Sequence, residues 1–232
     1  MNNFDPLETK KFSDLSLCWW DPEGPCKPLH KMGPLRLQAI IEQVPISGKK
    51  IIDIGCGGGL LTEDLVQCGA CVTGIDNSSE LISVAKQHAY CNNLSIHYEI
   101  NTAENKAQEQ AKSYDIVCCM ELLEHVPDPY SVIRACAQLV KPEGWVFFST
   151  LHRTFKSYLL AILAAEYVFN LLPRGTHHFA RFIKPSELAK AARDNKLMPI
   201  CIKGIGYNPV NEQVSFNLDV SVNYIIACQC IT

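Results

Sequence analysis

The sequence predicts an α/β domain in which helices cover both faces of a mostly parallel sheet. Strand-like apolar stretches alternate with helical patterns through much of the chain, and this alternation is typical of parallel sheets. The stretches expected to be strands are residues 50–55, 71–76, 95–100, 114–120 and 145–150. A chain of 232 residues, 47% of them hydrophobic, is long enough for one such domain with an insertion.

The helices follow from apolar spacing and from the residues that begin them. Between the strands, helices are expected at residues 59–68, 79–90, 103–112 and 128–140. The first 18 residues are polar and are expected to be frayed or helical. Pro34 is expected to begin a helix that continues through Ile41, because proline suits the first turn of a helix.

The pattern changes after residue 150. An apolar segment over 155–172 precedes a basic, histidine-rich loop over 173–181, and a helix is expected to start near Lys184. Two alternating stretches, 197–205 and 220–229, predict a last antiparallel pair of strands at the sheet edge. We therefore expect a single domain over 1–232. Its expected parts are an N-terminal helical segment (1–47), a cofactor-binding core (48–151), an apolar and basic insertion (152–185), and a C-terminal helix with strands (186–232).

A glycine-rich turn follows the first expected strand, where residues 51–59 are IIDIGCGGG. Gly55 and Gly57 leave the backbone bare, so a ligand can lie against it and face the first N–H groups of the next helix. Asp76 ends the second expected strand, about twenty residues after Gly55, where an acid binds ribose hydroxyls in doubly wound folds. The ligand is therefore expected to carry a ribose.

Asp53, just before this turn, helps to choose between ribose cofactors. The dinucleotide pattern requires glycine where Leu60 stands, and Asp53 would repel a pyrophosphate. S-adenosylmethionine carries a sulfonium and an α-amino group that suit a carboxylate. An acid before G-x-G-G-G, with a following strand that ends in Asp, resembles the first motifs of class I methyltransferases, which have a Rossmann-like doubly wound sheet. The alternatives are a nicotinamide cofactor and a turn without a ligand.

A cluster of titratable residues follows the fourth expected strand, where Glu121, Glu124 and His125 come after Met120. A phenol has a pKa of about 10, so methyl transfer to its oxygen needs a base, and imidazole suits neutral pH. His125 is therefore the candidate base, with Glu121 orienting or replacing it. Alternatively, Glu121, Glu124 and His125 hold a divalent cation that lowers the pKa of the acceptor. A third interpretation is that Glu124 and His125 only stabilise the loop.

Arg36 stands among apolar neighbours in the N-terminal segment. Its guanidinium fork suits the carboxylate of the cofactor. The alternative is a solvated surface arginine, which composition alone favours.

Charge and cysteine content bear on the function class. A net charge of −3 and a pI near 6.2 argue against a nucleic-acid-binding protein. The N-terminal residues are typical neither of a secretory signal nor of a transit peptide, so the cytoplasm is the expected location. The twelve cysteines are expected to be thiols there. Cys68 and Cys71 join a helix end to a strand start, whereas a thioredoxin-type pair opens a helix.

Blocks along nearly the whole chain resemble the ubiquinone-biosynthesis O-methyltransferase family, and the Trp-Trp and His-Val-Pro-Asp-Pro blocks are the most specific. The matching stretches are WWDPEG at 19–24, KPLH at 27–30, PLRL at 34–37, CMELLEHVPDP at 119–129, RAC at 134–136, FFSTL at 147–151, GTH at 175–177, FIKP at 182–185, YNP at 207–209 and VNY at 222–224. The family usually carries Gly, Asn and Asp where Glu143, His152 and His178 stand, and these departures leave the cofactor site unchanged.

The resemblance implies an S-adenosylmethionine-dependent O-methyltransferase that catalyses both O-methylation steps of ubiquinone synthesis. The acceptors would be a polyprenylated hydroxyphenol and a demethylubiquinol, and some members need a divalent cation. The resemblance also implies cofactor contacts at Arg36, Gly55, Asp76 and Met120. Asp53 and Gly57 are further candidates because of the charge and the bare backbone that they place at the turn. Two alternatives remain: a methyltransferase for another small phenol, and a non-catalytic cofactor-binding scaffold that contacts other quinone-pathway enzymes.

A prenylated acceptor stays in the bilayer, since burial of each CH₂ contributes about 0.8 kcal/mol. Segment 155–184 is expected to bring the chain to it. The apolar part is near the minimum length for spanning and contains Glu166, so we expect it to lie on the inner face of the cytoplasmic membrane. The alternative is a lid helix packed on the domain. The basic residues expected to meet anionic headgroups are Lys156, Arg174, His177, His178, Arg181 and Lys184.

Overall fold

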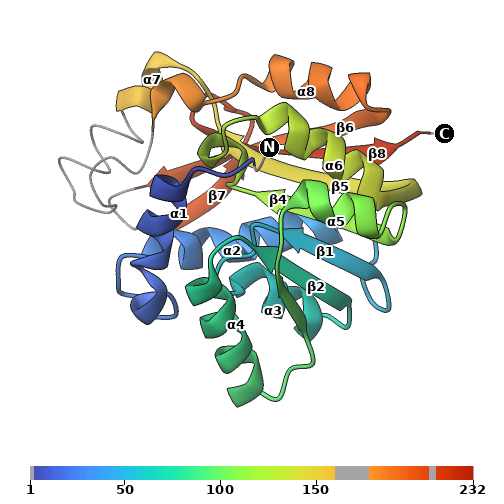
Figure 1. The fold of residues 1–232 in the computed structure, drawn as a ribbon. Coiled ribbons are helices and arrows are strands. Elements are labelled where there is room, and N and C mark those ends of the chain that lie inside the picture. Colours follow the sequence, from blue (N-terminus) through green and yellow to red (C-terminus); the bar gives the residue numbers. More distant parts are fainter. Residues whose placement is uncertain (1–2, 160–177, 209–212, 232) are drawn as a thin grey trace.

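A computed structural model of the chain describes residues 3–159, 178–208 and 213–231 (Figure 1). Its centre is an eight-stranded sheet with the order β3-β2-β1-β4-β5-β8-β6-β7. The first five strands along the chain pair in parallel, and the last three pair antiparallel. The strands are β1 (Lys50–Ile54), β2 (Cys71–Asp76), β3 (His97–Ile100), β4 (Tyr114–Met120), β5 (Val140–Leu151), β6 (Leu197–Asn208), β7 (Gln213–Asn217) and β8 (Asn223–Cys230).

Helices pack on both faces of this sheet, which confirms the predicted α/β class (Figure 1). The helices are α1 (Pro6–Ser13), α2 (Lys27–Ile41), α3 (Leu60–Gln67), α4 (Ser79–Cys91), α5 (Ala103–Glu109), α6 (Pro129–Leu139), α7 (Phe155–Ser157) and α8 (Pro185–Asp194). The side chains of successive strand residues pack into the hydrophobic cores on opposite faces of the sheet. Cys118 packs with α2 and α3, whereas Cys119 packs with α5, α6 and α8. Because both faces are covered, the central strands β1 and β4 are mostly apolar on both faces rather than alternating, with Asp53 and Asp115 as exceptions.

Two predictions about the ends of the chain need correction. Pro34 does not begin a helix but lies inside α2, which starts at Lys27 with Pro28 in its first turn. Both Pro28 and Pro34 could stand in the first turn of a helix, and the helix begins at the earlier of the two. The predicted C-terminal pair is present as β6 and β8, yet β8 lies between β5 and β6. The edge strand is instead β7, which the sequence analysis did not predict. It has only five residues, and polar side chains alternate with apolar ones along it.

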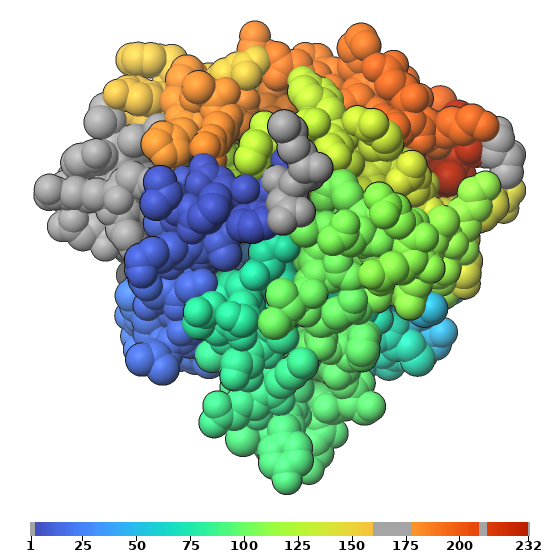
Figure 2. Space-filling model, viewed as in Figure 1, coloured from blue at the N-terminus to red at the C-terminus, as the bar shows by residue number. Residues whose placement is uncertain are grey.

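The topology brings several chemistry-bearing residues to one edge of the sheet. The parallel strands β1, β2 and β4 all end there, at Ile54, Asp76 and Met120. The N-terminal segment lies on the surface next to α4 and to residues after 178, where Asp5 pairs with Arg181 (Figure 2). Ligands of open α/β sheets bind at this edge, so the N-terminal segment is placed to cover such a site.

Candidate active site

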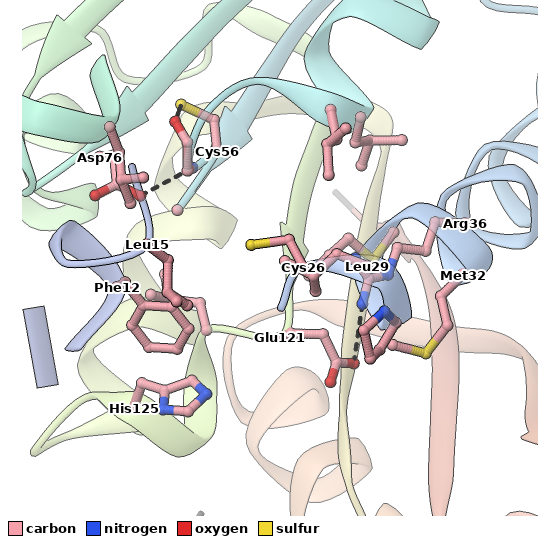
Figure 3. A pocket seen from close by; sticks show the side chains of 18 of the residues that line it. Phe12, Leu15, Cys26, Leu29, Met32, Arg36, Cys56, Asp76, Glu121 and His125 are labelled. Atoms are coloured by element: carbon pink, nitrogen blue, oxygen red, sulfur yellow. Dashed lines mark hydrogen bonds and ion pairs between the residues drawn. The ribbon is translucent and has the colours of Figure 1, made fainter. Parts of the chain in front are cut away.

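A cavity of about 1390 Å³ opens where β1, β2 and β4 end (Figure 3). Typical ligand pockets are about 300–1,000 Å³, so this one has room for two ligands. Asp76 lies at one end, and Arg36 and Glu121 lie together at another (Figure 3). The predicted site residues that line it are Arg36, Asp53, Gly55, Gly57, Asp76, Met120, Glu121 and His125. The structure thus brings together every predicted site residue except Glu124.

The glycine turn has a backbone that other residues rarely adopt. Gly55, Gly57 and Gly59 have φ angles of +71°, +55° and +94°, which favour glycine strongly. The turn is tied to β2 because the Gly57 N–H donates to Asp76 Oδ2 at 3.0 Å. Asp76 Oδ1 accepts a second bond, 2.8 Å long, from the Ser78 N–H. Asp76 therefore orders the turn and reaches the cavity at the same time.

Asp53 is a buried carboxylate at the floor of this cavity. One of its oxygens, Oδ2, accepts a 2.7 Å hydrogen bond from Thr62 Oγ1. Burial raises the pKa of Asp53 to about 6, although the Thr62 bond and the charge of Arg36 oppose the shift. A positive ligand would lower that pKa again, so the carboxylate is suited to a cation.

Arg36 is a buried residue of α2, only 7% exposed, and not a surface arginine. Its Nη2 lies 3.9 Å from Glu121 Oε1. Its Nε and Nη2 atoms have no hydrogen-bond partner among the described residues. Buried donors are nearly always paired, and an unmade bond to a charged group is costly. A ligand carboxylate would satisfy this guanidinium, so the residues present fit S-adenosylmethionine.

Glu121 is fixed in position by residues that sequence reasoning missed. Its φ of +53° is unusual for a residue other than glycine. Its Oε1 accepts a 2.7 Å bond from Ser149 Oγ, and Asn223 Nδ2 lies 3.2 Å from both carboxylate oxygens. Ser149 and Asn223 come from the ends of β5 and β8. The only sequence signal for them was their place in the family-like blocks.

His125 is paired with a residue of the N-terminal helix. Its Nδ1 lies 3.1 Å from Glu8 Oε2, and its ring meets Phe12 edge-on with 4.8 Å between centroids. Glu8 is only 4% exposed. Burial alone would raise the pKa of Glu8, but hydrogen bonds from His125 and Lys11 outweigh it and lower the pKa to about 2. No signal in the polar N-terminal sequence pointed to Glu8.

The predicted metal site is not assembled. Glu124 does not line the cavity; its Oε2 accepts a 2.8 Å bond from Thr150 Oγ1 in the interior. Burial and the neighbouring charge of Glu121 raise its pKa well above the usual range. Glu121, Glu124 and His125 therefore face three different sets of partners. Within residues 3–159, 178–208 and 213–231 no group of three His, Cys, Asp or Glu side chains is placed to hold a metal ion.

Comparison with known proteins identifies the family. A family described as "Methyltransferase domain" matches residues 27–200. Relatives named "Ubiquinone biosynthesis O-methyltransferase" include one from Burkholderia pseudomallei (strain 1710b), 50% identical over 229 residues, which are 99% of each chain. Another, from Ralstonia nicotianae, is 52% identical over 225 residues, 97% of this chain and 94% of the relative. The chain belongs to the ubiquinone biosynthesis O-methyltransferase family. The predicted membership and the predicted methyltransferase activity are thus confirmed.

Solved structures confirm the fold of this O-methyltransferase family member as that of class I methyltransferases. A magnesium protoporphyrin IX methyltransferase from Synechocystis PCC 6803, with bound SAH, aligns with a TM-score of 0.63 and 20% identity. The alignment covers 85% of this chain and 81% of that chain. A possible histamine N-methyltransferase from Thermotoga maritima aligns with a TM-score of 0.67 and 16% identity, covering 96% and 98%.

Proposed function

We propose that this methyltransferase transfers the methyl group of S-adenosylmethionine to the hydroxyl oxygen of a polyprenylated hydroxyphenol and of a demethylubiquinol. The observation that carries the proposal is the buried guanidinium of Arg36 at a cavity large enough for two ligands. Its Nε and Nη2 have no hydrogen-bond partner among the described residues, and the chain is about 50% identical to proteins named ubiquinone biosynthesis O-methyltransferase. A methyltransferase for another small phenol is the alternative enzyme. The non-enzymatic alternative is a scaffold that contacts other quinone-pathway enzymes.

We propose that different residues near the strand ends bind different parts of the methyl donor. Arg36 would bind its carboxylate by charge-assisted hydrogen bonds. Asp53 would face its positive charge, Asp76 would accept from the ribose hydroxyls, and the turn at Gly55 and Gly57 would lie along it. Met120 would add apolar contact. The donor supplies an activated methyl group when bound, and these residues hold and orient it beside the acceptor.

His125 is proposed as the base that removes the acceptor's proton. In this proposal Nδ1–H of His125 donates to the Glu8 carboxylate, which would fix the ring, and Nε2 would be the nitrogen that accepts the proton. A positioned base contributes roughly 10²- to 10⁴-fold to such a step. Glu121, fixed by Ser149 and Asn223, is proposed to orient the acceptor near Arg36. A divalent cation remains a prediction of the family resemblance, with no site among the described residues to carry it.

Peripheral membrane contact is proposed for the surface around α7. No helix in the described ranges is long and apolar enough to cross a bilayer. Most of the predicted segment 155–172 and the loop after it lie outside those ranges. What supports the proposal is the start of the segment. Phe155 is 74% exposed, and the Lys156–Asp219 ion pair holds α7 next to Leu218, which is fully exposed. Exposed apolar side chains that lie together on one surface suit the interface of a bilayer.

Co-sedimentation with anionic liposomes tests the membrane contact. Phe155→Ser with Leu218→Ser should lower the bound fraction. Tyr90→Ser, at a position of α4 whose exposure lies between those of Phe155 and Leu218, should not. If the wild-type protein, the double variant and Tyr90→Ser are all folded and bind the liposomes equally, the membrane contact is refuted.

Turnover tests the proposed function itself. Purified protein is incubated with labelled S-adenosylmethionine and a short-chain prenyl catechol, with and without a chelator, and the methyl ether is measured. Label in the ether supports the enzyme, and loss of that label with chelator would support the predicted cation. A scaffold would bind the donor without producing ether, and a preference for unprenylated phenols would favour the alternative enzyme.

A further inference from the structure

The Trp19–Trp20 pair contacts the glycine turn, and the proposed function above assigns it no role. The indole of Trp19 is buried and lies directly on the turn. A Cβ atom at Gly57 would be 2.4 Å from Cζ2 of Trp19, and one at Gly58 would be 2.3 Å from Cδ1. Two successive glycines therefore allow this contact, since no Cβ atom approaches other atoms so closely. Trp19 also lines the cavity.

Trp20 holds the same turn by a hydrogen bond. Its Nε1–H donates to the Gly58 carbonyl at 3.0 Å. Its ring stacks on His88 of α4, with 3.4 Å between centroids and 7° between planes. His88 Nδ1 in turn lies 2.8 Å from Oε1 of Glu63, a buried residue in the first turn of α3. The contacts thus run from the glycine turn through Trp20 and His88 back to the helix that the turn begins.

A turn with this many glycines does not hold its shape alone. Glycine loses more backbone entropy on ordering than any other residue. If a ligand had to order the turn, the cost would reduce its affinity. Contacts that order the turn beforehand remove that cost. Here they come from Trp19 and Trp20, which lie 38 or 39 positions before the glycines that they contact.

We propose that Trp19 and Trp20 are positioning residues that hold the glycine turn ready for the methyl donor. This rests on the proposed function, because it assumes that S-adenosylmethionine binds at the turn. The two side chains act differently. Trp20 uses its N–H, whereas Nε1 of Trp19 has no partner among the described residues and that side chain acts through the packing of its ring.

Isothermal titration calorimetry with S-adenosylmethionine tests whether Trp20 acts through its N–H and Trp19 through the packing of its ring. Trp20→Phe keeps an aromatic ring but loses the bond to Gly58, so Kd should rise about tenfold. Trp19→Phe should change Kd by less than about threefold, and Trp19→Ala should raise it about tenfold or more. The third tryptophan of the chain lies in β5, and Trp145→Phe is the matched control with unchanged Kd. At saturating donor, kcat of Trp145→Phe should also match the wild-type value.

Fluorescence tests whether the donor binds next to Trp19. The Trp20→Phe, Trp145→Phe double variant leaves Trp19 as the sole tryptophan, and its emission should change at saturating donor. The Trp19→Phe, Trp20→Phe double variant leaves Trp145, whose emission should not change.

Three results would overturn the role of the pair: unchanged Kd in both Trp20→Phe and Trp19→Ala, lower melting temperatures without weaker binding, or a constant Trp19 emission. Absence of donor binding by the wild-type protein would instead refute the proposed function.

Discussion

Oε2 of Glu8 lies 3.1 Å from Nδ1 of His125, across 117 residues of sequence. The carboxylate comes from the N-terminal helix, and the imidazole comes from the turn after β4. Both line the cavity, and Phe12 packs edge-on against the imidazole. The N-terminal segment therefore contributes to the chemistry of the site as well as covering it.

Replacement of Glu8 by glutamine should lower kcat by about tenfold or more. The amide keeps the size of the side chain but removes the charge that orients the His125 ring, which is part of the roughly 10²- to 10⁴-fold contribution of a base. The Kd for S-adenosylmethionine should not change. Glu109→Gln, at an exposed position of α5 that does not line the cavity, is the control with normal turnover. Unaltered kcat in Glu8→Gln would show that His125 needs no partner in α1.

The same variant should change the response of stability to acid. The pKa of Glu8 falls from the usual 4.5 to about 2 in the folded protein, since bonds from His125 and Lys11 outweigh its burial. The carboxylate therefore stabilises the fold above about pH 4.5, and this contribution is lost as pH falls towards 2. Free energies of unfolding from urea titrations at several pH values should fall less steeply for Glu8→Gln than for wild type over that range. Parallel curves would contradict the shift.

Arg36→Leu should separate ligand binding from stability. Nε and Nη2 of the guanidinium have no hydrogen-bond partner among the described residues, and Glu121, its ion-pair partner at 3.9 Å, keeps its bonds from Ser149 and Asn223. Removal of the guanidinium should therefore cost the ligand-free fold little. The donor, in contrast, loses its carboxylate partner, and its Kd should rise by about 10- to 100-fold, the range of a lost charge-assisted bond. Arg36→Lys should be intermediate because it keeps the charge without the fork. Calorimetric titration and thermal melting check both statements, and an unchanged Kd would remove Arg36 from the site.

Local patterns in the sequence predicted the sheet and its ligand-binding edge. The alternation of strand and helix patterns predicted strands β1 to β5. The last residues of β2 and β4, Asp76 and Met120, line the cavity as predicted. Contacts between distant segments carried no such signal. Glu8 meets His125, and Asn223 meets Glu121, only after the chain has folded.

The separation of the three candidate metal ligands has the same cause. Glu121, Glu124 and His125 are close in sequence, but each side chain is turned by a partner from elsewhere in the chain. The spacing of the three residues shows none of these partners.

Donor binding near pH 6 should release a proton from Asp53. Burial raises the pKa of this carboxyl to about 6 in the ligand-free protein, so it is about half protonated at that pH. A cationic ligand favours the ionised form and lowers the pKa, so binding must expel part of that proton. Titrations at pH 6 in two buffers with different heats of ionisation should differ, and at pH 8 they should agree.

Asp53→Asn should abolish the difference at pH 6, because the amide does not titrate. The demethylated product lacks the sulfonium charge, so it should release less of the proton than the donor does. Proton uptake on binding, or equal release by donor and product, would show that Asp53 does not face the positive sulfur.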